Sequence, residues 1–390
     1  MRSPPIVFGR ATAHGPKWPG VRKPLAQRHY HPVLRLGFAV ATIVLCAAAL
    51  EMALRYRDWP RTVTSGWRVS AQASPSNQFG WHGQPARPRR QNEFVIVMTG
   101  GAAVECLACP PGETLDLMLE HAVRRFNPNV RVVTMGATGY GQDQEYLALH
   151  DYFSHDRADL VINWASIADD VPTNTFRSGP KRPGQPALKP TFAWRNNDIL
   201  GPTEGIGDLV YHSKLSALIW PLFIDIDRNW TVLLPKADPG SDAPPRDIQA
   251  RSHVDDPLEQ QHSNWSIWLT PRPERVTYGI ELTHGLFLHM RELARLSGAR
   301  FAILLTPSPA DMRATAPIAL EHKGHWFVAD PRARDSAIAA ATDGFDQITL
   351  PPEDETPPSP DAERHVMARL AEALNEREML KPAPVERQRH

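Results

Sequence analysis

This chain of 390 residues has no net charge, because 43 Lys and Arg residues balance 43 Asp and Glu residues. That balance argues against a nucleic-acid partner, which calls for a basic surface. Cysteine is scarce, with three residues, and the sequence places beside them none of the further ligands that a zinc site needs. No internal repeat is visible. The length fits one large domain with insertions, or two domains, and no metal or cofactor is expected.

Long hydrophobic runs are few, and one of them lies near the N-terminus. Residues 36–50 form an uncharged, mostly apolar run after a basic segment rich in Pro, Gly and His. The run is a little short for the roughly 20 residues of a bilayer span, but its flanks extend it, so a transmembrane anchor is predicted over 33–54. By the positive-inside rule the basic tail, residues 1–32, is expected in the cytoplasm and the rest outside. A signal peptide cleaved at the alanines 47–49 is the alternative.

Proline, with 38 residues, marks the irregular parts of the chain. Residues 55–92 are interpreted as a loosely packed lead-in whose Trp59, Trp67 and Trp81 pack on the main domain. The main domain is expected over 93–380. Within it, residues 172–272 form an insert, either a lid or a small subdomain. Residues 381–390 are expected to be a disordered tail.

The main domain alternates apolar runs with helix-like segments. Apolar runs that end in glycine or in small or acidic residues predict buried parallel strands. Strands are predicted over 94–98, 130–135, 160–164, 301–305 and 347–350. Helices are predicted over 113–126, 142–153, 274–296, 332–341 and 361–380.

This order predicts an α/β fold, a flavodoxin-like three-layer sandwich around a central parallel sheet of about five strands with right-handed crossovers. Ligands of open parallel sheets bind at the carboxyl ends of the strands. Three loops are expected to converge there, namely 100–102, 136–141 and 165–170.

The sequences of these loops resemble those of the SGNH hydrolases, the GDSL-type esterases and acyltransferases, especially the membrane-anchored bacterial members. The family ends its first strand in Gly-Asp-Ser or Gly-Gly-Ser, and this chain has Gly100-Gly101-Ala102. The second family block is Asn-x-Gly-x-x-Gly, and here the glycines are Gly136 and Gly139, with Thr134 in place of the Asn.

Two further blocks extend the resemblance over most of the chain after about residue 79. The third family block ends in Asn-Asp, and here it is Asp169-Asp170. The last block has the form Asp-x-His-Pro-Asn-x-x-x-His before a final helix. The segment from Ser359 to His365 matches its spacing, with Ser359 at the place of the catalytic His.

The resemblance implies that the catalytic positions are degenerate. The nucleophile position holds Ala102, which cannot attack a carbonyl, and the base position holds Ser359, which cannot take up a proton at neutral pH. Asp169 stands where an oxyanion donor is expected and, when ionised, would repel the oxyanion. Gly101, Ala102, Gly139, Asp169 and Asp170 are the expected ligand-binding positions.

The chain is therefore expected to be a catalytically degenerate SGNH-like protein, in a single pass through the bacterial inner membrane, with its main domain in the periplasm. Its expected partners are the membrane, an acylated envelope glycan and envelope-assembly proteins. The alternative is an active esterase or O-acyltransferase for carbohydrate or lipid esters with non-standard residues. Ser166, Asp170, Asp354 and His365 are the candidates for that chemistry.

Three smaller features carry expectations of their own. Cys106 and Cys109 are expected to be either a structural disulfide, which the spacing allows outside the cytoplasm, or two free thiols. Redox chemistry is disfavoured because the thioredoxin-type context is missing. His322 and His325 lack a third metal ligand in view and are expected in a surface loop. A flavodoxin-like domain unrelated to esterases, with a phosphate on the loop 136–141, is a further alternative.

Overall fold

A computed structural model describes most of the main domain and one N-terminal helix. The described residues are 32–57, 77, 81–85, 87–110, 112–176, 191–201, 213, 215, 216, 219, 264–306, 316–322, 325–350 and 360–381. The predicted cytoplasmic tail, most of the insert and the tail after Lys381 lie outside them, as do Trp59, Trp67, Asp354 and Ser359.

The N-terminal helix α1 spans Pro32–Tyr56. Its segment Arg35–Tyr56 has 22 residues with a mean hydropathy of 2.1, which is long and apolar enough to cross a membrane. Its most apolar 18-residue window has no buried residue, and Leu54 near its end is buried.

Five parallel strands form the central sheet. They are β1 Phe94–Gly100, β2 Val130–Gly136, β3 Leu160–Ala165, β6 Arg300–Leu305 and β9 Gln347–Thr349. Their order across the sheet is β2-β1-β3-β6-β9. In order of appearance this is 2-1-3-4-5, a doubly wound arrangement in which the strand order reverses between β1 and β3. The predicted five-stranded parallel sheet is confirmed.

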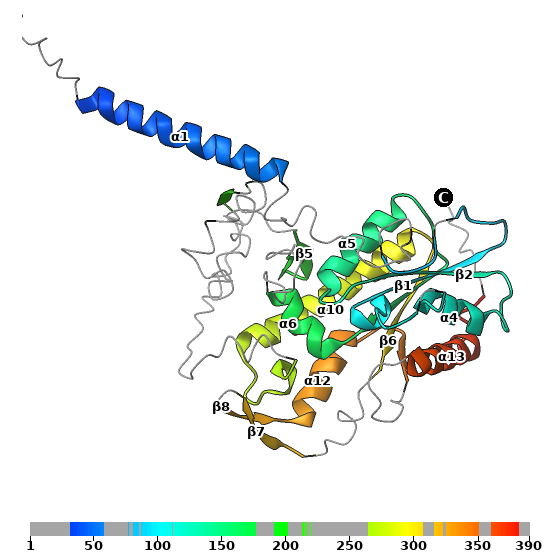
Figure 1. The fold of residues 1–390 in the computed structure, drawn as a ribbon. Helices are drawn as coiled ribbons and strands as arrows, with labels where there is room; N and C mark the ends of the chain where they lie inside the picture. The colour runs from blue at the N-terminus through cyan, green and yellow to red at the C-terminus, as the bar shows by residue number, and fades with distance from the viewer. Residues whose placement is uncertain are drawn as a thin grey trace, which may run out of the picture. The chain divides into compact units, whose positions relative to one another are not determined.

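Helices cover both faces of the sheet and give three layers (Figure 1). One face, which carries Ile96 of β1, packs on α4 Leu115–Val123 and α13 Pro360–Glu376. The other face carries Val97 of β1. It packs on α5 Gln142–Phe153, α6 Ile167–Thr175, α10 Glu274–Leu296 and α12 Pro331–Thr342. Alternate side chains of β1 thus feed two separate apolar layers, as the period of a strand requires.

Two antiparallel hairpins lie beside the central sheet. β4 Ala193–Arg195 pairs with β5 Asp198–Leu200, and the Trp194 ring packs so closely on α10 that a Cβ at Gly285 would lie 2.3 Å from it. β7 Ile318–His322 pairs with β8 His325–Ala329. The expectation of a surface loop for His322 and His325 was therefore wrong: both residues belong to strands, where backbone pairing holds them.

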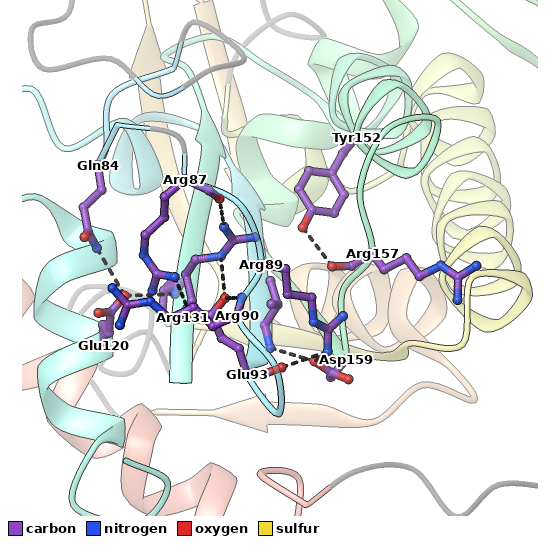
Figure 2. A network of polar contacts seen from close by, with 12 residues as sticks. Gln84, Arg87, Arg89, Arg90, Glu93, Glu120, Arg131, Tyr152, Arg157 and Asp159 are labelled. Carbon is purple, nitrogen blue, oxygen red and sulfur yellow. Dashed lines mark hydrogen bonds and ion pairs between the residues drawn. The ribbon is translucent and has the colours of Figure 1, made fainter. Parts of the chain in front are cut away.

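The lead-in is held to the sheet at the amino ends of the strands by a polar network (Figure 2). Arg87 pairs with Glu93 just before β1, with 2.5 Å between Nη1 and Oε1. Arg89 pairs with Asp159 just before β3, with 2.7 Å between Nη2 and Oδ2. Trp81 is 1% exposed. Trp81 thus packs with the domain. The network lies at the amino ends of the strands, away from their carboxyl ends, where a site is expected.

Candidate functional site

The switch point between β1 and β3 brings three loops together at the carboxyl ends of the strands. Gly100 pairs with Gly136 at the end of β2 and with Trp164 near the end of β3, so the three strands end side by side. In open α/β sheets a ligand binds in the crevice outside such a reversal. The structure brings together the three loops that the sequence predicted to converge.

The first loop leads into α3 Ala102–Glu105, a single helical turn. Gly101 is its N-cap, with a φ of −85°, and Ala102 is exposed at its first position. Val104 packs into the notch between β1 and β2, where a Cβ at Gly100 or at Gly136 would lie 2.5 Å from its side chain. The retained glycines Gly100 and Gly136 therefore have a packing reason that is independent of chemistry.

The second loop is tied to the first by a buried carboxylate. Glu105 is 7% exposed, and its Oε2 accepts hydrogen bonds from the Thr138 backbone N–H over 2.7 Å and from the Thr138 hydroxyl. Gly139 follows with a φ of +86°, a backbone conformation that favours glycine. Glu105 thus sets where the amide of Gly139 lies relative to Ala102.

The third loop begins α6 at Ser166, its N-cap, whose backbone N–H donates to Asp170 Oδ2 over 2.8 Å. The Ser166 side chain makes no capping hydrogen bond to a helix amide. Its hydroxyl donates instead to Asp169 Oδ2, also over 2.8 Å, and both side chains are exposed. Asp170 therefore has a structural role at the helix N-terminus, and the exposed Ser166 hydroxyl lies at the switch point.

Beneath the third loop lies a chain of buried polar side chains. Gln142 donates to Asp170 Oδ2 over 2.5 Å and accepts from Asn174 Nδ2 over 2.7 Å. Asn174 also donates to Thr283 of α10 over 2.8 Å. All four residues are at most 3% exposed. The chain joins α5, α6 and α10 behind the switch point.

A second buried group lies one turn further along α5. Asn163 of β3 donates from Nδ2 to Thr99 Oγ1 over 2.9 Å and to the Glu145 carboxylate. Burial raises the pKa of Asp170 well above its usual range, and the nearby Glu145 carboxylate raises it further, against the hydrogen bond from Gln142. Asp170 is thus harder to ionise than an exposed carboxyl.

The first turn of α5 gives no support to a phosphate site. The Asp143 N–H points to Asn174 Oδ1 at 3.4 Å, and the Gln144 N–H donates to Asp143 Oδ1 over 2.8 Å. Asp143 and Glu145 are both fully buried there. Amides already bonded to protein oxygens, beside buried acidic side chains, form a poor cradle for an anion.

The remaining candidates lie apart or outside the described residues. His365 is exposed on α13, on the other face of the sheet from Ser166 and α6. Cys106 and Cys109 are joined by a disulfide that closes the turn after α3. Within the described ranges, no group of three or more His, Cys, Asp and Glu side chains is placed to hold a metal ion.

Comparison with known proteins adds no family to this geometry. No protein-family model matches the chain, and a search of curated proteins finds no significant match. Two buried carboxylates, Glu105 and Glu145, and the partly buried Glu363 were not singled out from the sequence. A Glu in a helical segment usually predicts a solvent-exposed face, and the partners of Glu105 and Glu145 lie on other elements.

Proposed function

We propose that this protein is a membrane-anchored, SGNH-hydrolase-like protein that binds an acylated envelope glycan and has lost efficient ester cleavage. The observation that carries the proposal is the position of Ala102. It is exposed at the start of α3, directly after β1 and at the switch point, where the proposed family carries its nucleophile. A methyl group there leaves room for an acyl group but supplies no attacking atom.

The open space beside Gly101 supports a binding role. Gly101 has only ordinary contacts near its Cα, with the nearest atom 3.9 Å from an added Cβ. Loss of a nucleophile or base from a hydrolytic triad costs on the order of a millionfold in turnover in a well-studied protease. Binding energy from backbone donors survives that loss. A carbohydrate ester held by such a loop would be bound without attack by a side chain at position 102.

The proposed location is the periplasmic face of a bacterial inner membrane. The apolar helix α1 follows a basic segment, which favours an N-terminus inside and a main domain outside. The disulfide between Cys106 and Cys109 fits an oxidising compartment. The proposed partners are therefore acylated glycans and the proteins that assemble them at the membrane surface.

The proposal is tested by binding of acetylated and chemically deacetylated oligosaccharides to the detergent-solubilised full chain, measured by calorimetry. We expect at least tenfold tighter binding of the acetylated form. Ala102→Trp should remove that preference, because the ring would fill the acyl position. Ala340→Trp, on an exposed position of α12, is the matched control. Equal binding of both glycans by the natural chain would refute the proposal.

A gain-of-function variant tests the proposed register. Ala102→Ser combined with Ser359→His should raise hydrolysis of short nitrophenyl esters at least a hundredfold over the parent chain. The two residues would then supply a nucleophile and its base. A double variant that folds normally but remains inactive would show that positions 102 and 359 are not the nucleophile and base positions.

One observation favours a second function, an active esterase or O-acyltransferase. The exposed Ser166 hydroxyl lies 2.8 Å from the Asp169 carboxylate at the end of β3. A carboxylate is a weak base for a serine, so this version predicts slow turnover. Ser166→Ala should abolish hydrolysis if Ser166 is the nucleophile, and unchanged hydrolysis would rule this function out.

A further inference from the structure

A partly buried carboxyl group lies at the start of the last helix. Glu363 lies in the first turn of α13, one turn before Met367 and two turns before Leu370, which are both fully buried. The Oε2 atom of Glu363 is buried and has no hydrogen-bond partner among the described residues. An unpartnered buried oxygen of this kind is costly. Its persistence therefore calls for an explanation other than stability.

The direction of α13 places Glu363 at the carboxyl ends of the strands, where the candidate site lies. The far end of α13 lies at the amino ends of the strands, because Arg300, the first residue of β6, donates to the Glu378 carbonyl over 3.1 Å. The first turn therefore lies at the carboxyl ends. There Arg364 donates to Glu113 over 2.6 Å, just before α4.

The same face of the sheet carries α3. Val104 of α3 and Met367 of α13 belong to one apolar cluster. The carboxyl of Glu363 stands one turn above Met367, toward the loops that leave the strands. It thus lies on the α3 side of the sheet and at the same end as Ala102.

The chemistry of this carboxyl suits proton transfer at neutral pH. Burial raises the pKa of Glu363 to about 7, and no neighbouring charge contributes. A lone carboxyl in an apolar setting that titrates near the working pH is a usual general acid or base. The chain has Ser359 where the proposed family has its base, so this role is unfilled.

We propose that Glu363 is a general base that activates a water molecule for direct attack on an ester bound at the loop of Gly101 and Ala102. This step uses the acyl-binding site of the proposed function and adds a slow activity to it. The carboxylate takes a proton from water as the water oxygen bonds to the ester carbonyl carbon. The tetrahedral intermediate collapses, the ester C–O bond breaks, and Glu363 returns the proton to the leaving alkoxide. No covalent intermediate with the protein forms.

The test is hydrolysis of nitrophenyl acetate by the detergent-solubilised full chain, followed from pH 5 to 9. We expect a rate above buffer that rises with pH to a plateau with its midpoint near neutrality. No burst of nitrophenolate and no acetylated protein in the mass spectrum are expected. Glu363→Gln should lower the catalysed rate at least tenfold, since general bases contribute about 10²–10⁴-fold. Glu376→Gln, on an exposed position of the same helix, should keep the parent rate and pH profile.

Three results would overturn the role of Glu363: a Glu363→Gln variant as active as its parent, a burst with an acetylated protein, or a natural chain no faster than buffer. Circular dichroism and thermal unfolding of each variant verify that it is folded. Binding of the acetylated oligosaccharide separates this inference from the proposed function. Glycan binding without hydrolysis refutes only the base, whereas hydrolysis through Glu363 without a preference for the acetylated glycan refutes only the binding function.

Discussion

The Glu105 carboxylate accepts a hydrogen bond from the Thr138 backbone N–H over 2.7 Å, and so joins the turn after β1 to the loop after β2. The two segments are far apart in the sequence, and each carries positions of the candidate site. This side chain adds to the pairing of Gly100 with Gly136 in fixing how the two loops lie relative to each other.

Replacing Glu105 should loosen this connection. Glu105→Ala leaves the Thr138 amide without its acceptor, and we expect a loss of about 2–3 kcal/mol in the free energy of unfolding, because hydrogen bonds to a charged group contribute about that much. Glu105→Gln keeps one acceptor and should lose less than half of that. Urea unfolding measures both, with the surface variant Glu376→Gln as the control. Equal losses for the two Glu105 variants would show that packing, and not the acceptor, carries the effect.

Gly100 at the end of β1 and Gly101 directly after it should differ in how well they tolerate a methyl group. A Cβ at Gly100 would lie 2.5 Å from Val104 Cγ2 and 2.9 Å from the Trp164 carbonyl, whereas a Cβ at Gly101 meets nothing closer than 3.9 Å. Gly100→Ala should therefore cost about 1–3 kcal/mol through overpacking, and Gly101→Ala should be close to neutral. Thermal unfolding of the two variants checks this contrast. Val104→Ala should relieve part of the Gly100→Ala penalty when the two changes are combined.

The sequence predicted the regular part of the fold well, since apolar runs ending in glycine indicate buried strands. The predicted helices 142–153 and 274–296 have the bounds observed for α5 and α10. The helix predicted over 113–126 is shorter, Leu115–Val123, because Glu113 and Thr114 belong to the turn before it. The pair β7 and β8 was missed because a short hairpin with mixed polarity gives little periodicity.

For the candidate site, the sequence predicted where the loops lie but not which side chains are buried behind them. The positions of the three loops follow from the strand order, which any parallel sheet of this kind imposes. The buried polar side chains behind them do not. Gln142 and Asn174 read locally as polar helix residues, and their burial depends on α10, more than a hundred residues after α6 begins. Burial of a polar group is a property of packing, which local sequence patterns do not report.

The disulfide between Cys106 and Cys109 should stabilise the turn modestly. Closing so short a loop restricts the unfolded chain little, and the chain-entropy relation gives about 2 kcal/mol for a loop of four residues. The double variant Cys106→Ser, Cys109→Ser should lose about that amount in urea unfolding. Dithiothreitol should bring the natural chain to the same stability and leave the double variant unchanged. Two alkylatable thiols at positions 106 and 109 in the unreduced protein would contradict the disulfide.

The free energy of unfolding should fall as the pH rises, because burial raises the pKa of two carboxyl groups. Burial raises the pKa of Glu363 from 4.5 to about 7. Between those values the unfolded chain releases a proton that the folded chain keeps, so the stabilising contribution is complete below pH 4.5 and is lost as the pH rises through 7. A shift of this size corresponds to about 3 kcal/mol at most. Asp170, whose pKa burial also raises, acts in the same direction.

Glu363→Gln should therefore unfold at nearly the same urea concentration at pH 5 and pH 8, apart from the remaining slope due to Asp170. The natural chain should be less stable at pH 8 than at pH 5 by about 2–3 kcal/mol. The exposed variant Glu376→Gln should keep the slope of its parent. A natural chain that gains stability between pH 5 and pH 8 would mean that Glu363 is ionised and paired in solution, and a carboxylate already held by a cation would be too weak a base to activate water.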